Sequence, residues 1–436
     1  MKWMSILLGV SVLTGCASAK NKPSVRISTV SNTGMPTHIV KPGNLWNFGA
    51  GSLWTHKGWQ YAAYWDDARQ VTVGRRKLPE GKWETFSLPD YQRTSTGDRG
   101  KGGKKSQGFG DGHEKVAMGI SPDGVIHLSF DHHLSTLRYR YTVLPVADNP
   151  EKYTWTPELF SPVKDNLGGP QIVSVTYPSF STDGKHFVLY LRLNGGSGSA
   201  DSNYFEYMDG KWLINDEASA KLIDKNWSGG DKTVNAYLHG LVFHNGRRYI
   251  TWCWRDTPNA RTCHDLCFAY SDDQGKTWKN NDGKVIGKRG EMPITADSPG
   301  VAAIEIPPGS WFQNGGSMVV DSDGRVHVLM QGEKGQPVHF ERDPFSGEWS
   351  RNKSSAEGKL VVAPKGDSLY IATYDGLLRT SAETFGKTET LVSGKKHYFK
   401  DSKMGIDRTR VEQDGWVSVI GQNGKKVTVL DYWIGP

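Results

Sequence analysis

The sequence lacks any apolar run long enough to cross a membrane as a helix. The apolar stretch near its N-terminus covers only residues 6–13, whereas a spanning helix needs about 20 apolar residues. No long amphipathic helical pattern is present, and no nucleic-acid-binding motif. These absences argue against a helical fold and against nucleic acid as a partner. Charged residues make up 23% of the chain and apolar residues suffice for a core, which excludes a disordered protein.

The short N-terminal apolar stretch is typical of an export signal. Lys2 precedes it, and Leu13-Thr14-Gly15-Cys16 at its end resembles the bacterial lipobox. We therefore predict a lipoprotein signal peptide over residues 1–15, lipidation of Cys16 and a polar tether over residues 16–24. The protein would then be exported and anchored to the cell envelope, at the outer membrane or cell surface. The alternative is an ordinary signal peptide that contains a chance cysteine.

The chain is rich in glycine, with 51 residues, and carries a formal net charge of +7. Many glycines fit many tight turns. A basic exported protein suits an anionic partner such as an acidic polysaccharide. Unselected surface charge would explain the same excess. The 16 tryptophans and 17 tyrosines favour strands, and some can also stack on sugar rings.

A turn glycine followed by an apolar or aromatic strand recurs seven times. The copies begin at Gly58, Gly124, Gly184, Gly246, Gly324, Gly366 and Gly415. Hairpin after hairpin predicts an all-β fold. We expect a seven-bladed β-propeller of four-stranded antiparallel blades, forming a single domain over residues 25–436, although six or eight blades would fit a different choice of copies. The strand over residues 25–30 would complete the last blade and close the ring.

Residues 271–278 match the Asp-box pattern S-x-D-x-G-x-T-W. In this box the aspartate caps a hairpin, the glycine takes a special backbone angle, and the tryptophan fills space between strands. The box therefore supports a propeller and indicates no chemistry.

Histidines form the first group of candidate chemical residues. His113 ends the tripeptide DGH at residues 111–113, and His132 and His133 follow the strand over residues 125–130. Because adjacent strand residues face opposite ways, only one of His132 and His133 can point at a given site. A histidine can exchange a proton near neutral pH, but each of these can equally be bonded to backbone.

The second group surrounds a glycine-rich loop. Tyr177 lies in the tripeptide TYP, and Arg192 leaves a strand just before Asn194 and the loop at residues 195–198. The guanidinium can grip a carboxylate through two hydrogen bonds, and the phenol can exchange a proton. Both residues can also be a strand tyrosine and a surface arginine.

Three of the 4 cysteines lie within fifteen residues, at Cys253, Cys263 and Cys267. His264 adjoins Cys263, and His239 and His244 lie upstream. Two cysteines and two histidines fit tetrahedral zinc. An exported protein can instead form a Cys253–Cys263 disulfide, which would leave Cys267 as a buried thiol. The residues favour zinc because the cysteine count is odd and a histidine adjoins.

Together these segments resemble the BNR-repeat propeller family that includes the ulvan lyases of polysaccharide lyase families 24 and 25. The resemblance runs from about Trp46 to the C-terminus, and the compact single-domain chain favours family 25. Its most specific parts are DGH, TYP, LYLRLNGGSG at residues 189–198 and the stretch over residues 239–265.

The resemblance implies a lyase that cleaves an anionic sulfated polysaccharide by β-elimination beside a uronic acid. His113 matches the general base, and His133 matches a second catalytic histidine. Tyr177 matches the proton donor, and Arg192 the residue that neutralises the substrate carboxylate. No organic cofactor is implied.

The resemblance also implies residues that bind substrate and metal. Tyr237 and Asn194 are expected to contact substrate. A structural zinc is expected at His239, Cys253, Cys263 and His264. We expect the protein to act as a monomer.

Other functions fit the same propeller. A sialidase needs an arginine triad, and the N-terminal part of the sequence has no Arg-Ile-Pro motif. A non-catalytic glycan-binding propeller would keep the aromatics and the basic charge without needing His113 or Tyr177. A structural or partner-binding propeller is a third alternative.

Overall fold

The computed structural model describes residues 25–35, 48, 51–93, 113–312, 315–332, 335–363, 368–374, 376–381, 387–393, 399 and 404–435. The predicted signal peptide, the tether and Cys16 lie outside these residues, as do residues 111 and 112 of the DGH motif. Of the helices in the described part of the chain, none is long and apolar enough to cross a membrane.

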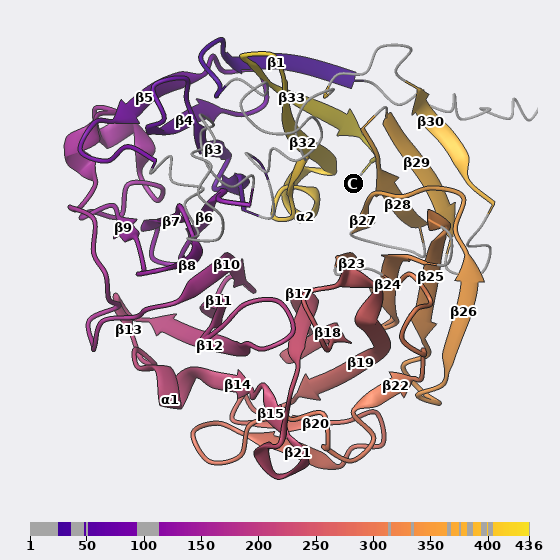
Figure 1. Cartoon of the computed structure of the whole chain (residues 1–436). Coiled ribbons are helices and arrows are strands. Elements are labelled where there is room, and N and C mark those ends of the chain that lie inside the picture. Colours follow the sequence, from indigo (N-terminus) through magenta and orange to yellow (C-terminus); the bar gives the residue numbers. More distant parts are fainter. Residues whose placement is uncertain are drawn as a thin grey trace, which may run out of the picture.

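Seven antiparallel sheets surround a common axis, which confirms the predicted seven-bladed propeller (Figure 1). Blade 1 contains β2 (Leu53–His56), β3 (Trp59–Trp65), β4 (Val71–Lys77) and β5 (Glu84–Leu88). Blade 2 contains β6 (Val116–Ile120), β7 (Ile126–Phe130) and β9 (Tyr139–Tyr141). Blade 3 contains β8 (His133–Ser135), β10 (Val175–Thr182), β11 (Phe187–Leu193), β12 (Asp201–Met208), β13 (Lys211–Trp212) and β14 (Lys221–Ile223).

The remaining blades follow in chain order. Blade 4 contains β17 (Asn235–His244), β18 (Arg247–Arg255), β19 (Cys263–Ser271), β20 (Thr277–Lys279), β21 (Val285–Lys288) and β22 (Ala302–Ile304). Blade 5 contains β23 (Gly316–Val320), β24 (Val326–Gln331), β25 (Pro337–Arg342) and β26 (Trp349–Lys353). Blade 6 contains β27 (Lys359–Val362), β28 (Ser368–Ala372), β29 (Gly376–Ser381) and β30 (Glu389–Ser393). Blade 7 contains β31 (Gly405–Asp407), β32 (Trp416–Asn423), β33 (Lys426–Trp433) and β1 (Val25–Ser31).

Short elements fill the connections between these strands. They are the ribbon of β15 (Asn226–Trp227) and β16 (Lys232–Thr233), the helices α1 (Glu217–Ala220) and α2 (Val411–Asp414), and the 3₁₀ turns η2 (Pro150–Lys152), η3 (Pro157–Leu159), η4 (Ser228–Gly230) and η5 (Ala260–Thr262).

The N-terminal strand closes the ring, as the sequence predicted. β1 pairs antiparallel with β33, with Val25 opposite Tyr432 and Thr29 opposite Thr428. The last blade therefore combines strands from both ends of the described chain. Because β1 is the outermost strand of this sheet, the pairing links the start of the described chain to its end.

The Asp-box has the structural role expected from its sequence. Asp273 accepts hydrogen bonds from the backbone N–H of Thr277 at 2.9 Å and from the Ser271 hydroxyl at 2.9 Å. Gly275 has a φ of +79°, which a side chain would disfavour. Trp278 is fully buried.

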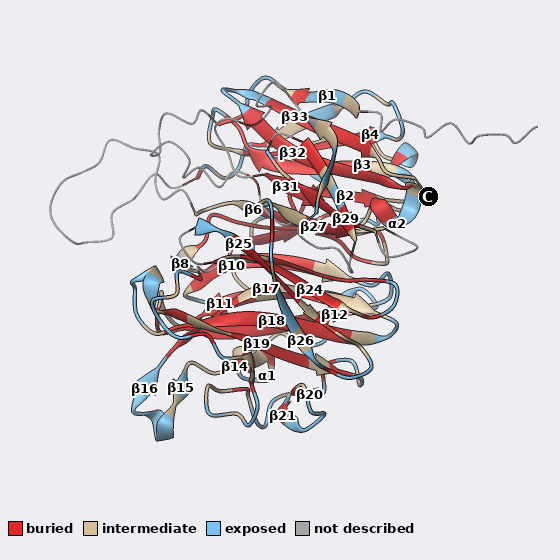
Figure 2. Cartoon of the chain, turned by 90° about the vertical axis from the view of Figure 1, so that its right-hand side faces the viewer, coloured by how far each residue is buried: buried red, intermediate tan, exposed pale blue. Residues whose placement is uncertain are grey.

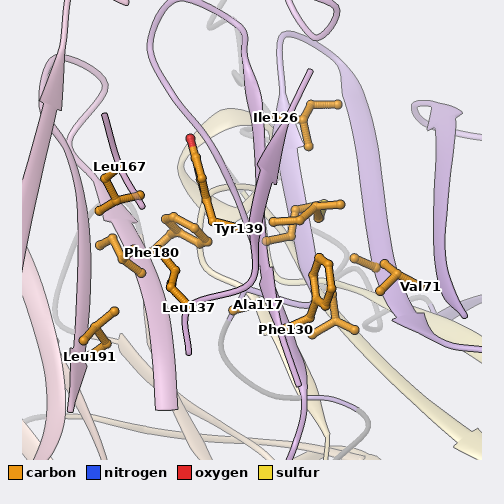
Figure 3. Packing of buried hydrophobic residues seen from close by; sticks show 14 of the residues in the cluster. Val71, Ala117, Ile126, Phe130, Leu137, Tyr139, Leu167, Phe180 and Leu191 are labelled. Carbon is orange, nitrogen blue, oxygen red and sulfur yellow. The ribbon is translucent and has the colours of Figure 1, made fainter. Parts of the chain in front are cut away.

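The apolar core lies between neighbouring blades. Buried strands stack through the body of the ring, and exposed residues concentrate at its edges (Figure 2). Between the first three blades, Val71, Phe130, Tyr139 and Phe180 belong to one continuous buried cluster (Figure 3). Because every blade packs against two others, side chains near the axis are held by rigid strands.

Candidate active site

A bulge in the inner strand of blade 3 positions Tyr177. The pairing of β10 with β11 shifts register between Thr176 and Ser179. Tyr177, inside the bulge, has a φ of +55°. This left-handed conformation is unfavourable for a tyrosine, and such strain concentrates at functional sites.

The strand register brings His133 and Arg192 to the same place. Thr176 lies opposite His133 of β8 on one side and opposite Arg192 of β11 on the other. β8 belongs in sequence to the segment between β7 and β9 of blade 2, yet it pairs with blade 3. Through this pairing, His133 lies at the edge of blade 3 although it belongs to the chain segment of blade 2.

His113, His133 and Tyr177 form a cluster of three rings. The centroid of His113 lies 5.1 Å from that of His133 and 6.1 Å from that of Tyr177. The His133 and Tyr177 centroids are 6.3 Å apart. The residues predicted to exchange protons are therefore gathered within one small volume.

Arg192 lies beside this cluster, with its guanidinium carbon 4.9 Å from the centroid of the Tyr177 ring. Its Nη1 donates to Asn235 Oδ1 and to Tyr237 Oη, each at 3.3 Å. Its Nε and Nη2 are buried and have no hydrogen-bond partner, and no carboxylate of the described residues forms an ion pair with it. These two nitrogens make up one edge of the guanidinium, which is the geometry that binds a carboxylate through two hydrogen bonds.

Tyr237 orients the arginine. Its hydroxyl also contacts Ser197 Oγ at 2.8 Å and accepts from Arg255 Nη1 at 3.2 Å. Tyr237 is thus fixed by three neighbours and lines the same cavity as Arg192. This placement agrees with the predicted substrate-side position of Tyr237.

A cavity of about 840 Å³ occupies the centre of the ring, and His113, Tyr177, Arg192 and Tyr237 line it. Its walls carry more basic than acidic side chains. The basic ones are Lys57, Lys115, Arg192, Lys359 and Arg408, and the acidic ones are Asp183, Glu357 and Glu412.

Lys115 was not recognised from the sequence. Burial lowers its pKa to about 8, so its charge is sensitive to pH just above neutrality. Its position two residues after His113 was the available signal. The burial that changes its pKa depends on the ring as a whole, which no local pattern reveals.

Two residues are placed away from the site. His132 is buried, with its ring nitrogens 3.1 Å from Ser129 Oγ and from Ser135 Oγ. Burial lowers the pKa of His132 to about 3, so it is a neutral structural residue. Of the two adjacent histidines, His133 is the one whose ring lies beside His113 and Tyr177. Asn194 donates to Asp201 Oδ2 at 3.1 Å and also to Glu217. It is not among the residues that line the cavity, so the structure does not bring this predicted substrate ligand to the site.

The cysteines of blade 4 gather without a disulfide. Cys253, Cys263 and Cys267 are all buried. A hydrogen bond with Cys263, together with burial, raises the pKa of the Cys253 thiol well above its usual range. The two thiols predicted to bind zinc are therefore neighbours.

The two histidines predicted to complete the zinc site point elsewhere. His264 lies 3.0 Å from Asp256 Oδ1 and 2.9 Å from Asp265 Oδ2. Burial lowers its pKa, but these aspartates outweigh burial and raise the pKa to about 9. His239 Nδ1 lies 3.1 Å from Thr251 Oγ1, and its ring lines the central cavity. Within the described chain these four residues do not form a converging ligand set, and zinc at this hairpin stays a prediction.

The ring of seven blades and the Asp-box define the class of the protein, a repeat-built β-propeller. The sequence profile of the BNR repeat-containing family matches residues 59–356, and the chain belongs to this family. A comparison with curated protein sequences found no significant match.

Two solved structures share the fold over nearly the whole chain. One is described as an ulvan lyase of polysaccharide lyase family 25. It is 14% identical, with a TM-score of 0.63, and the match covers 92% of this chain and 94% of that chain. The other is an ulvan lyase of the same family bound to -[GlcA(1-4)Rha3S]-. It is 15% identical, with a TM-score of 0.62 and the same coverage.

Proposed function

We propose that this protein is a polysaccharide lyase that cleaves a sulfated, uronic-acid-containing polysaccharide of the ulvan type. The observation that carries the proposal is the unpartnered edge of Arg192 beside the rings of His113 and Tyr177. A buried cation with two unused donors is costly unless a ligand satisfies it. A substrate carboxylate satisfies both donors.

The reaction that fits these residues is β-elimination. Arg192 neutralises the uronate carboxylate, which stabilises the charge that develops when C5 loses its proton. His113 takes the C5 proton, the C4–C5 double bond forms, and the C4–O4 bond breaks. Tyr177 gives its proton to the leaving O4. The reaction consumes no water, so the site needs no pair of carboxylates of the kind that glycosidases use.

The basic excess of the cavity and the chain supports a polyanionic substrate. The likeness to the oligosaccharide-bound ulvan lyase supports the same substrate class. His133 would serve as a second base for the epimeric uronate, whose C5 proton lies on the opposite face, or would orient substrate. A lipid anchor at Cys16 would hold the enzyme at the cell envelope.

The test is a screen of purified uronic-acid polysaccharides, including ulvan, for the ultraviolet absorbance of unsaturated uronate ends. We expect this absorbance to rise with ulvan. Tight binding of ulvan without any such product would instead identify a glycan-binding propeller. Release of free sialic acid from a sialoside would identify a hydrolase.

A further inference from the structure

A second cluster of histidines lies in blade 5, away from the central site. His327 of β24 lies opposite Glu341 of β25, and His339 precedes Glu341 by two residues on the same face. Leu329, on the same face as His327, packs against blade 6. Both histidines are fully buried, and the Glu341 side chain is 18% exposed. The cluster therefore lies between two blades, with a route to solvent on the Glu341 side.

Three potential ligand atoms converge in this cluster. His327 Nδ1 is 3.1 Å from His339 Nε2 and 3.8 Å from Glu341 Oε2. The three atoms all lie within 4.8 Å of one another. A tetrahedral zinc ion with bonds of about 2.0–2.1 Å holds its ligand atoms roughly 3.3 Å apart. The separations of His327 Nδ1 from the other two ligand atoms, 3.1 and 3.8 Å, are close to that value.

Asp321 supplies the outer partner that a metal-binding histidine normally has. Its Oδ2 is 3.2 Å from His327 Nε2. Its Oδ1 is fixed by the backbone N–H groups of Asp323 at 3.0 Å and Arg325 at 2.8 Å. A carboxylate that accepts from Nε2–H leaves Nδ1 unprotonated and directed at the ligand position.

Blade 2 shows what the fold requires at these positions. His127 lies opposite Tyr141, as His327 lies opposite Glu341. Its ring nitrogens are 3.0 Å from Ser121 Oγ and 2.6 Å from Tyr139 Oη. Blades 2 and 5 therefore both contain a buried histidine that contacts the preceding turn and the next strand. In blade 2, hydroxyl groups alone satisfy the two ring nitrogens.

In blade 5, all three residues around the shared histidine differ from those in blade 2. Asp321, His339 and Glu341 stand where blade 2 has Ser121, Tyr139 and Tyr141, at the same spacings from the shared histidine. Each change replaces a hydroxyl with a carboxylate or an imidazole. Arg325 Nε lies 3.7 Å from Glu341 Oε1, so this carboxylate has a cationic neighbour. Packing alone still does not call for a second carboxylate and a second imidazole around a buried histidine, since burying charged groups is costly.

We propose that His327, His339 and Glu341 bind a divalent transition-metal ion of the zinc type, with Asp321 orienting His327. Two imidazoles and a carboxylate favour Zn²⁺ over Mg²⁺ or Ca²⁺, which prefer oxygen ligands alone. The ion would replace the proton that otherwise joins His327 to His339, and water at the Glu341 side would complete its coordination. Its role is to tie β24 to β25 beside blade 6.

The test is a titration of the chelator-treated full-length protein with Co²⁺, followed by visible absorption. A Cys253→Ser/Cys263→Ser background removes the predicted thiolate site. We expect about one Co²⁺ per chain, without thiolate charge-transfer bands, displaced by Zn²⁺ and accompanied by a higher melting temperature. The wild type is titrated in parallel, because thiolate bands separate the two sites even if the double variant folds poorly.

Substitutions in blade 5 locate the ion. His339→Tyr introduces the blade 2 residue, which can still bond to His327, and should abolish Co²⁺ binding in a folded protein. Glu341→Gln preserves size and should weaken binding at least tenfold, and Asp321→Asn should weaken it by about 10–100-fold. Glu348→Gln, on an exposed carboxylate of the same blade, should change nothing. The proposal would be overturned if the folded Cys253→Ser/Cys263→Ser protein bound no Co²⁺, or if adding His339→Tyr left its Co²⁺ binding unchanged.

Discussion

His113 and Tyr177 line a cavity of about 840 Å³ and His133 lies beside them, whereas His327 and His339 are enclosed between blades 5 and 6. The two clusters use the same ring types. Beside the first, Arg192 keeps two hydrogen-bond donors unpaired, and in the second His327 faces His339, Glu341 and Asp321. Access to a cavity and unsatisfied donors mark a site for a ligand that comes and goes. Enclosure marks a site that holds the fold together. Substitutions should therefore affect rate in the first cluster and stability or metal content in the second.

Tyr177→Phe should cause the largest loss of activity. It removes the proton donor but keeps the ring beside Arg192, so the rate should fall by about 10²–10⁴-fold, or roughly 3–5 kcal/mol. Initial rates of unsaturated-uronate formation measure the effect, and thermal unfolding should be unchanged. A variant with near-wild-type activity would show that Tyr177 is not the proton donor.

Arg192→Lys should follow, with a rate lower by about 10²–10³-fold. Lysine keeps the charge but cannot present two parallel donors, so it should not restore what Arg192→Ala loses. Arg247→Lys, at a partly exposed arginine of blade 4, is the matched control and should be neutral. Full activity in Arg192→Lys would mean that charge alone is sufficient and that the two-donor contact is not used.

The cysteines of blade 4 give the next contrast. The His339→Tyr variant lacks the proposed blade 5 site, so metal analysis should still find about one zinc per chain, bound at the blade 4 cysteines. Adding Cys253→Ser to this variant should remove that zinc. Catalytic rates measured on the remaining folded protein should be close to normal, since the role is structural. A metal-free protein with a Cys253–Cys263 disulfide would rule out this zinc site.

Substitutions of the adjacent residues His132 and His133 should have different effects, one on stability and the other on activity. His132→Ala leaves Ser129 and Ser135 without their partner and should lower the free energy of unfolding by about 1–3 kcal/mol. His133→Ala should leave stability unchanged and lower the rate. Denaturant unfolding and initial rates on glucuronate- and iduronate-containing substrates give both readouts. The reverse pattern would exchange the roles of the two residues.

Lys115 should give the smallest effect, visible as a pH dependence. Because burial lowers its pKa to about 8, the lysine is charged below that pH and loses its charge as the pH rises through it. Polyanion affinity should therefore weaken between pH 7 and pH 9 by about 1.5–5-fold, the equivalent of 0.2–1 kcal/mol. Lys115→Arg stays charged and should remove this part of the pH dependence. An identical pH profile in the variant would exclude Lys115 from binding.

The blades could be predicted because a turn glycine and the strand after it are local features. The strand over residues 25–30 was also predicted to close the ring, and β1 does so by pairing with β33. The sequence motifs predicted that His113, Tyr177 and Arg192 lie close together. In the structure, the rings of His113 and Tyr177 are neighbours and Arg192 lies beside Tyr177. The direction of the Asn194 side chain depends on Asp201 and Glu217 and was not predictable.

Two features could not be predicted from the sequence because they depend on contacts between strands. His327, His339 and Glu341 meet only through the register of β24 with β25. Spacings of 12 and 2 residues carry no meaning until that register is known. Likewise, the choice between His132 and His133 depends on the pairing of β8 with β10.

The mass of the products formed from ulvan tests the central claim most directly. Elimination leaves unsaturated ends that are lighter by one water than the ends left by hydrolysis. We predict that the wild type produces such ends and that Tyr177→Phe and Arg192→Ala, both folded, produce almost none. Saturated ends from the wild type, or no cleavage of any uronic-acid polysaccharide, would contradict the assignment of this site as a lyase.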